Sequence, residues 1–194
     1  MEEPQTIRFV PARFLESFIA VARALLRQPG RFFEQLRPSG SLAGPLVFLF
    51  VCLFVASLFV ANIIGAELPL FAAFFVSWSV AMVLGTMGSH AMLASPLFNA
   101  RLPYEATLSV IAYANIVVLV AWIPLLGIIA NMYGLYLMYL GFKTIHRLPA
   151  QRAGVAVFLT VLQVEFIRLI MIRMTAPQWL DSLIQTIESG SMPA

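Results

Sequence analysis

The chain has 194 residues, of which 61% are hydrophobic and only 11% charged, and its formal net charge is +3 at pH 7. A water-soluble domain of this composition would expose large apolar patches, so the composition excludes that class and indicates an integral membrane protein. The positive charge does not indicate a nucleic-acid partner, because the basic residues lie beside apolar segments rather than on a polar, aromatic-studded face. Cys52 is the single cysteine, which leaves neither a disulfide nor a thiolate metal site within one chain.

The N-terminal segment predicts an amphipathic helix over residues 14–26, with large apolar side chains on one face and a basic polar face. It is too charged to span a bilayer. We expect it either along the inner membrane surface or packed on the cytosolic end of the bundle. At the surface, Arg13, Arg23 and Arg27 would contact anionic headgroups. A second short amphipathic segment covers residues 31–37.

Five membrane-length apolar segments follow, at residues 45–64, 68 to about 90, 105–122, 124–142 and 153 to about 174. All must be helices, because a bilayer leaves no other way to satisfy the backbone of such segments. The predicted fold class is therefore all-α: a polytopic membrane bundle of about five transmembrane helices, with amphipathic interfacial helices at the N-terminus and C-terminus. The C-terminal one covers residues 178–187. The predicted parts are a cytosolic segment 1–43, a membrane domain 44–175 and an extracytosolic tail 176–194.

The distribution of basic residues predicts the orientation. Of twelve lysines and arginines, only Arg168 and Arg173 lie in or beyond the last span if the N-terminus is cytosolic, which leaves ten on the cytosolic side. Cytosolic loops carry such an excess of basic residues. An odd number of spans then places the C-terminus outside, as in a multi-pass protein of the cell inner membrane.

Two stripes of small residues predict close helix packing. One lies in the second span and the other in the fourth, both at steps of three or four residues that keep them on one helix face. We expect both stripes to build the bundle rather than to bind a ligand. Their members are Ser77, Ala81, Gly85 and Ser89, and then Gly127, Gly134 and Gly141 together with Asn131.

The fifth span carries the most costly polar residues. Glu165 and Arg168 lie three residues apart on one face, whereas Thr160 and Gln163 lie on the opposite face. An unpaired charge near the bilayer centre costs about 2.5 kcal/mol or more. One interpretation is an ion pair within the helix that serves only structure. The other is a partner site, a proton-linked site or a polar cavity.

Other polar side chains extend the candidate intramembrane polar or partner site. His90 lies near the inner end of the second span, beside cytosolic loops where Arg101, Glu105, Lys143 and His146 can converge. Two histidines without an acidic or cysteine neighbour at ligand spacing do not indicate a metal, and we expect no cofactor. Catalytic motifs of membrane enzymes are absent, so we expect no enzymatic activity. The candidate residues are Glu165, Arg168, Gln163, His90, Tyr113, Asn115 and Asn131.

Several short motifs occur in a characteristic order: Pro29-Gly30-Arg31-Phe32-Phe33, Pro45-Leu46-Val47-Phe48, Ala112-Tyr113-Ala114, Ile123-Pro124-Leu125-Leu126-Gly127, and Gly141 with His146. Over roughly residues 12–174 the chain resembles the Yip family, the Ypt/Rab-interacting membrane proteins, whose bacterial relatives share the five-span domain. Ile116 lies near where family members often carry a proline, so the chain has no proline to kink the third span there. For eukaryotic members the resemblance would imply Rab binding and vesicle traffic. The short N-terminal region favours the bacterial branch instead.

Two hypotheses of function follow. The first is a non-enzymatic adaptor that organises other membrane proteins, further copies of itself or the bilayer. The second is a transporter or channel component in which Glu165, Arg168, Gln163 and Tyr113 line a polar path. An adaptor should have a packed interior and an exposed ridge of small residues, whereas a conductor should have a water-filled vestibule.

Overall fold

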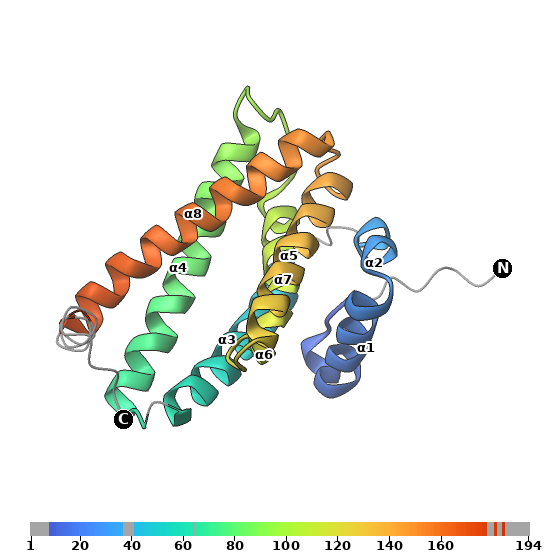
Figure 1. Ribbon diagram of the computed structural model, residues 1–194. Helices are drawn as coiled ribbons and strands as arrows, with labels where there is room; N and C mark the ends of the chain where they lie inside the picture. Colours follow the sequence, from blue (N-terminus) through green and yellow to red (C-terminus); the bar gives the residue numbers. More distant parts are fainter. Residues whose placement is uncertain (1–7, 37–40, 64, 178–180, 182–183, 185–194) are drawn as a thin grey trace.

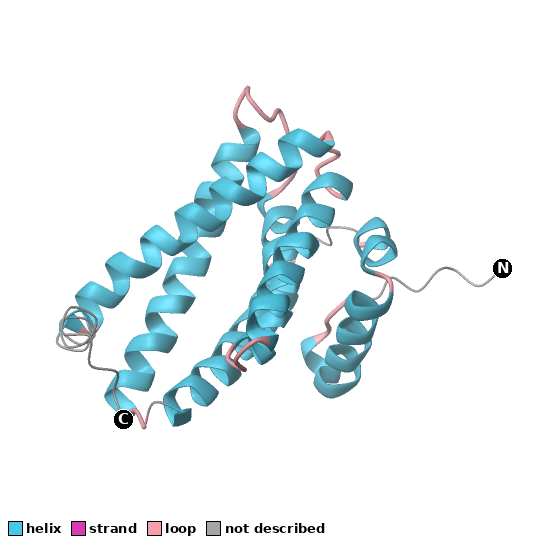
Figure 2. Ribbon diagram, in the orientation of Figure 1, coloured by secondary structure: helices cyan, strands magenta, loops and turns pink. Residues whose placement is uncertain are grey.

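A computed structural model describes residues 8–36, 41–63, 65–177, 181 and 184. The described residues form helices and loops and contain no strand (Figure 2). The elements are η1 (Pro11–Arg13), α1 (Phe14–Arg27), α2 (Pro29–Gln35), α3 (Ala43–Ile63), α4 (Leu68–Ala94), α5 (Tyr104–Ala114), η2 (Asn115–Val117), α6 (Val118–Ala121), α7 (Leu126–Thr144) and α8 (Ala150–Thr175). The all-α fold class is thus confirmed.

Four helices are long and apolar enough to cross a membrane: α3, α4, the continuous stretch Tyr104–Ala121 and α8. The predicted fourth span corresponds to α7, which has 19 residues but carries Asn131, three tyrosines and Lys143. Helix α7 is not among the helices identified as long and apolar enough to cross a membrane. The bundle therefore has four candidate spans and a further helix, α7, packed among them.

The third span is interrupted although it has no proline. Its α-helix ends at Ala114 and continues as a short 3-10 turn before α6. The Asn115 side-chain amide donates a hydrogen bond to the backbone oxygen of Ile111 at 2.8 Å. Such a side-chain bond competes with the helical hydrogen-bond ladder and distorts it. The α-helix of the third span is therefore interrupted at Asn115, although no proline occurs there.

Helix α5 is the centre of the bundle, since every residue from Glu105 to Ala114 is buried. Helices α3, α4 and α7 contact it. Helices α4 and α8 run side by side over much of their length, beside the group formed by α3, α5, α6 and α7 (Figure 1). The bundle therefore consists of an α4–α8 pair and a central group, which contact each other where α4 meets α3 and α5 and where α8 meets α7.

The two stripes of small residues form seams inside the bundle. On α4, a Cβ added at Gly85 would lie 2.3 Å from Val164 Cγ2, and the Ser77 hydroxyl lies 2.8 Å from that of Thr175 on α8. Ala81 and Ser89 are also buried on α4. On α7, the three glycines face the third span: Gly127 meets Ala121, Gly134 meets Val117 and Gly141 meets Val110. No small-residue stripe is left exposed along these described helices.

Helix α1 lies against the flank of the bundle. Phe18 stacks on Phe48 of α3 at 5.0 Å, and the Tyr133 hydroxyl of α7 donates to the Leu25 backbone oxygen at 2.7 Å. In α2, Phe32 packs edge-on against Tyr113. Helix α1 is amphipathic, as predicted, and its apolar face is wide: one half of that face covers α3 and α7, and the other half stays exposed. Leu15 is 71% and Leu26 66% exposed on that second half.

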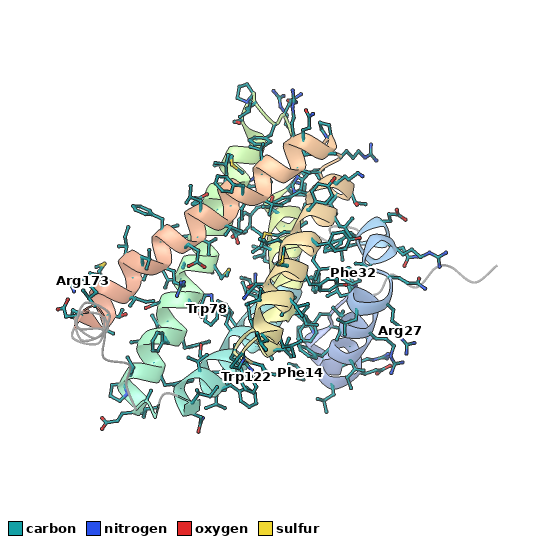
Figure 3. The ribbon with its side chains drawn as sticks, in the orientation of Figure 1. Phe14, Arg27, Phe32, Trp78, Trp122 and Arg173 are labelled. Carbon is teal, nitrogen blue, oxygen red and sulfur yellow. The ribbon has the colours of Figure 1, made fainter. Side chains whose placement is uncertain are left out.

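The three arginines predicted to contact anionic lipid are exposed, Arg13 at the end of η1 and Arg23 and Arg27 on α1. Figure 3 shows Arg27 on the side of α1 away from the bundle, whereas Phe32 of α2 lies toward the bundle. Lipid contact by these arginines stays a prediction. The predicted C-terminal amphipathic helix, residues 178–187, lies largely outside the described residues. Near it, Arg173 at the end of α8 forms an ion pair with Asp181.

Candidate functional site: an intramembrane cleft

A cavity of about 350 Å³ lies between the α4–α8 pair and the third span and α7. We call it the intramembrane cleft. Trp78 points into it from α4 (Figure 3). Leu135 of α7 is 41% exposed and lines the cleft, so the cleft opens toward the outside of the bundle beside α7. The polar side chains in its wall come from three segments: Asn115, Asn131, Thr160 and Glu165.

These polar groups lie at a similar depth. At 1.5 Å per residue, Asn115 is about 16 Å from the start of α5, Asn131 about 20 Å from the end of α7, and Thr160 about 15 Å from the start of α8. Those three helix ends share the side of the bundle that carries the α4–α5 and α7–α8 loops (Figure 1). A bilayer core is about 30 Å thick, so the polar wall of the cleft lies near its middle.

Glu165 and Arg168 form an ion pair on α8, as one interpretation of the sequence expected. Two nitrogens of the guanidinium donate to Glu165 Oε2, Nε at 2.8 Å and Nη2 at 2.5 Å. The side chains are 47% and 32% exposed, respectively, so the pair lies at the lip of the cleft rather than within the bundle. The pair cancels the net charge at the lip, which lowers the cost of placing Glu165 in a bilayer.

Thr160 also faces the cleft, although Glu165 lies five residues further along and points about 140° away around the helix. The cavity is wide enough to expose both sides of α8. Thr160 is fully buried, and its Oγ1 has no hydrogen-bond partner among the described residues. Thr160 and Glu165 thus lie on nearly opposite faces of α8 and still line the same cavity. Sequence reasoning also missed Trp78, for which the sequence contains no signal.

The other predicted site residues do not join the cleft. Gln163 packs across the α4–α8 seam, where a Cβ added at Gly88 would lie 1.5 Å from its Nε2. Tyr113 lies on the far side of α5, where its hydroxyl accepts a hydrogen bond from the Phe9 amide at 3.3 Å. His90 lies toward the loop end of α4. The single polar path through Glu165, Arg168, Gln163 and Tyr113 is therefore not assembled.

His90 belongs to a second polar cluster near the loops. Its Nδ1 lies 3.2 Å from Thr107 Oγ1 on α5, which lies 3.3 Å from His146 Nε2 in the α7–α8 loop. These contacts between His90, Thr107 and His146 connect three segments at the end of the bundle where the α4–α8 pair meets the central group. His146 Nδ1 is buried without a partner. In the described part of the chain, no group of three or more His, Cys, Asp or Glu side chains is placed to hold a metal ion.

The folding stability of the protein should depend on pH because of His146 in this cluster. Burial, and next the charge of His90, lower the pKa of His146 from 6.5 to about 4. The unfolded chain thus binds a proton between these values that the folded chain does not, so stability decreases as pH falls from 6.5 to 4 and is unaffected above 6.5. We expect a loss of about 2 kcal/mol at about pH 5, measured as thermal stability in detergent. His146→Gln should remove most of that loss, whereas an unchanged pH profile in this variant would contradict the assignment.

Comparison with protein families finds a match to the Yip1 domain over residues 23–172. The matched region begins in α1 and ends in the last turn of α8, so it includes the intramembrane cleft. No curated protein and no solved structure matches the chain significantly.

Proposed function

Because this chain belongs to the Yip1 domain family, we propose that this integral membrane protein is a non-enzymatic adaptor that holds a transmembrane segment of a partner membrane protein against the intramembrane cleft. The observation that carries the proposal is the set of polar side chains near mid-bilayer in a cavity that opens beside α7. Polar groups at such depth find hydrogen-bond partners on neighbouring helices. The small-residue stripes pack inside the bundle, so the exposed ridge expected of an adaptor is not found on the described helices, and we assign the partner to the cleft instead.

The proposal includes a location and an orientation. We place the protein in a bacterial inner membrane, and the excess of basic residues on one side supports a cytosolic N-terminus and an extracytosolic C-terminus. In this arrangement the α4–α5 and α7–α8 loops face the cytosol. The partner segment then lies beside α7 and α8, between their exposed apolar side chains. These include Ile128, Leu135 and Phe158.

Photo-cross-linking in intact membranes tests the adaptor function. A photoreactive amino acid at Leu135, at the lip of the cleft, should form an adduct of discrete mass with a membrane protein. The same group at Ile129 is the matched control, because Ile129 is 66% exposed on another face of α7. It should not form that adduct. An adduct of twice the chain mass would identify a second copy as the partner.

A second pair of variants links the adduct to the cleft. Val161→Trp places an indole in the cleft, since Val161 lines it, whereas Leu162→Trp places the same side chain on an outer face where Leu162 is 57% exposed. The adduct should disappear in the first variant and persist in the second. Equal adducts at Leu135 and Ile129, or an adduct that survives Val161→Trp in a folded protein, would reject the proposal.

A transporter or channel component is the second candidate, because Glu165 lies at the lip of a cavity with polar walls. It is less favoured. The lining residues on α7 and α8 run only from Asn131 to Met138 and from Thr160 to Glu165, and so lie in the middle of these helices. A conducting path needs polar lining toward both sides of the membrane. A cavity confined to mid-bilayer fits a binding site better than a pathway.

A further inference from the structure

Another cavity, of about 160 Å³, lies between the N-terminal segment and the first turns of α3 and α5. We call it the N-terminal cavity. The polar side chains in its wall include Arg8, Glu105, Ser109 and Tyr113. Tyr113, the lining residue furthest along α5, is about 14 Å from the start of that helix. Because α3 and α5 both begin at this end of the bundle, the cavity lies near one membrane surface, where phospholipid head groups meet the bilayer core.

Specific contacts hold the N-terminal segment over this cavity. Phe9 is 2% exposed, and its backbone amide donates to the Tyr113 hydroxyl at 3.3 Å. The Ser17 hydroxyl accepts a hydrogen bond from the Val10 amide at 3.1 Å and donates to the Val10 carbonyl oxygen at 3.0 Å. Because Phe9 and Val10 are fixed in this way, the backbone of Arg8 is held beside the cavity that its side chain lines.

Three of the lining groups bring hydrogen-bond donors to the cavity. The Tyr113 hydroxyl accepts from Phe9, and its own proton has no acceptor among the described residues. Ser109 is 5% exposed and forms no hydrogen bond in the described part of the chain, yet its hydroxyl oxygen is not sealed off as Thr160 Oγ1 is. The Arg8 guanidinium adds further N–H donors and a positive charge. Two hydroxyls and a guanidinium in one wall suit the oxygens of a phosphate group.

Glu105 brings the opposite charge to the same cavity. It is 6% exposed, and an ionised carboxylate accepts hydrogen bonds from several donors at once. Glu105 therefore repels a ligand that carries only negative charge, whereas a zwitterion can place its phosphate at Arg8 and its ammonium at Glu105. The volume of about 160 Å³ corresponds to about five water molecules, which suits a small head group such as phosphoethanolamine.

Exposed apolar side chains adjoin the N-terminal cavity. Val10 lines it and is 36% exposed. Leu42, which lies between the lining residues Ser41 and Ala43, is 40% exposed. Leu15, on the exposed half of the apolar face of α1, follows Val10 closely in the chain. These side chains offer a surface for the acyl chains of a lipid, which a soluble phosphate ester does not possess.

We propose that the N-terminal cavity binds the head group of a phosphatidylethanolamine molecule from the adjacent leaflet. The phosphate contacts Arg8, Ser109 and Tyr113, the ammonium contacts Glu105, and the acyl chains lie over the exposed apolar side chains beside the cavity. The site is separate from the intramembrane cleft, so it does not depend on the adaptor function. It gives the N-terminal segment a role in selecting a lipid, in addition to covering the bundle.

Lipid titration of the full-length protein in mild detergent tests the proposal, with bound lipids counted by native mass spectrometry. The probes are phosphatidylethanolamine, phosphatidylcholine and phosphatidylglycerol with identical acyl chains. Phosphatidylethanolamine should bind about tenfold more tightly than the other two. The choline group has no N–H donor for Glu105, and the glycerol head group leaves an uncompensated negative charge beside it. O-phosphoethanolamine, which has no acyl chains, should not displace the lipid at equal concentration.

Variants of the lining residues should change the lipid preference in different ways. Glu105→Gln should abolish the preference for phosphatidylethanolamine over phosphatidylglycerol. Arg8→Gln should weaken the binding of both lipids about tenfold, and Ser109→Ala about threefold. The matched controls are Arg23→Gln, at an exposed position of α1, and Ser57→Ala, at a position of α3 that is 1% exposed. Neither residue lines the cavity, so both control proteins should bind as the natural protein does.

Several outcomes would overturn the proposal. These are equal affinity for phosphatidylethanolamine and phosphatidylcholine, tighter binding of phosphatidylglycerol, and displacement of the lipid by O-phosphoethanolamine at equal concentration. Unchanged lipid affinity in folded Arg8→Gln and Ser109→Ala proteins would overturn it as well. These two variants keep the test decisive if Glu105→Gln, which alters a buried carboxylate, does not fold.

Discussion

Gly127→Ala should lower the free energy of unfolding more than any other addition of a single methyl group to α7. A Cβ at this position would lie 2.2 Å from the backbone oxygen of Ala121, in the short turn where the third span and α7 meet. A backbone carbonyl cannot rotate away as a side chain can, so the two helices must separate. We expect a cost of about 3 kcal/mol. The measurement is the midpoint of thermal unfolding in mild detergent. A thiol-reactive dye detects unfolding, because Cys52 is the single cysteine and is fully buried in the folded protein.

Gly154→Ala is the matched control, because the same methyl group meets nothing within 4 Å there. Gly154 lies inside α8, and alanine is the better helix former by about 0.5–1 kcal/mol. The control variant should therefore be as stable as the natural protein or slightly more stable. A Gly127→Ala protein with an unchanged midpoint would show that the α6–α7 contact is looser than the close approach at Ala121 implies.

Replacing either member of the Glu165–Arg168 pair alone should destabilise the protein strongly, whereas replacing both should not. Glu165→Met leaves the guanidinium unmatched and Arg168→Met leaves the carboxylate unmatched, each at a cost of about 2.5 kcal/mol or more. The double variant has no charge left to neutralise and should return to within about 1 kcal/mol of the natural protein. The thiol assay at Cys52 measures all three variants as a double-mutant cycle.

Arg173→Met is the control for this cycle. Arg173 pairs with Asp181 at the end of α8, and both side chains are about half exposed, at 55% and 52%. An exposed pair of this kind contributes about 0–1 kcal/mol. If the three Glu165 and Arg168 variants behave like Arg173→Met, the pair does not lie in a low-dielectric environment. If the double variant is stable but loses the cross-link at Leu135, the carboxylate serves the partner as well as the fold.

The predicted polar residues lie in different parts of the structure, and these positions determine which of them can act together. Glu165 and Asn115 share the intramembrane cleft, whereas Tyr113 lies under the N-terminal segment and His90 near the loops. A variant at Tyr113 therefore tests the docking of α1 and α2, and a variant at His90 tests the loop end of the bundle. Neither reports on the cleft, although the sequence alone suggested one polar path.

The sequence by itself determined the class of protein, the family and most helix positions, because these depend on local composition and short spacing. Runs of apolar residues define spans wherever a bilayer is the solvent. The Glu165–Arg168 pair was also predictable, since residues three apart on a helix are neighbours in any fold. The family resemblance, drawn from short motifs in order, was confirmed by the match over residues 23–172.

Only the tertiary structure decided which polar groups meet. Thr107 and His146 are 39 residues apart, and no periodicity relates them. Helical spacing places Thr160 and Glu165 on opposite faces of one helix, but it does not give the width of the space beside that helix, which both residues line. The sequence likewise predicted the apolar face of α1, but only the tertiary structure shows that α3 and α7 cover half of it. Hydrophobic patterning records that a side chain avoids water, whereas packing determines whether it meets lipid or another helix.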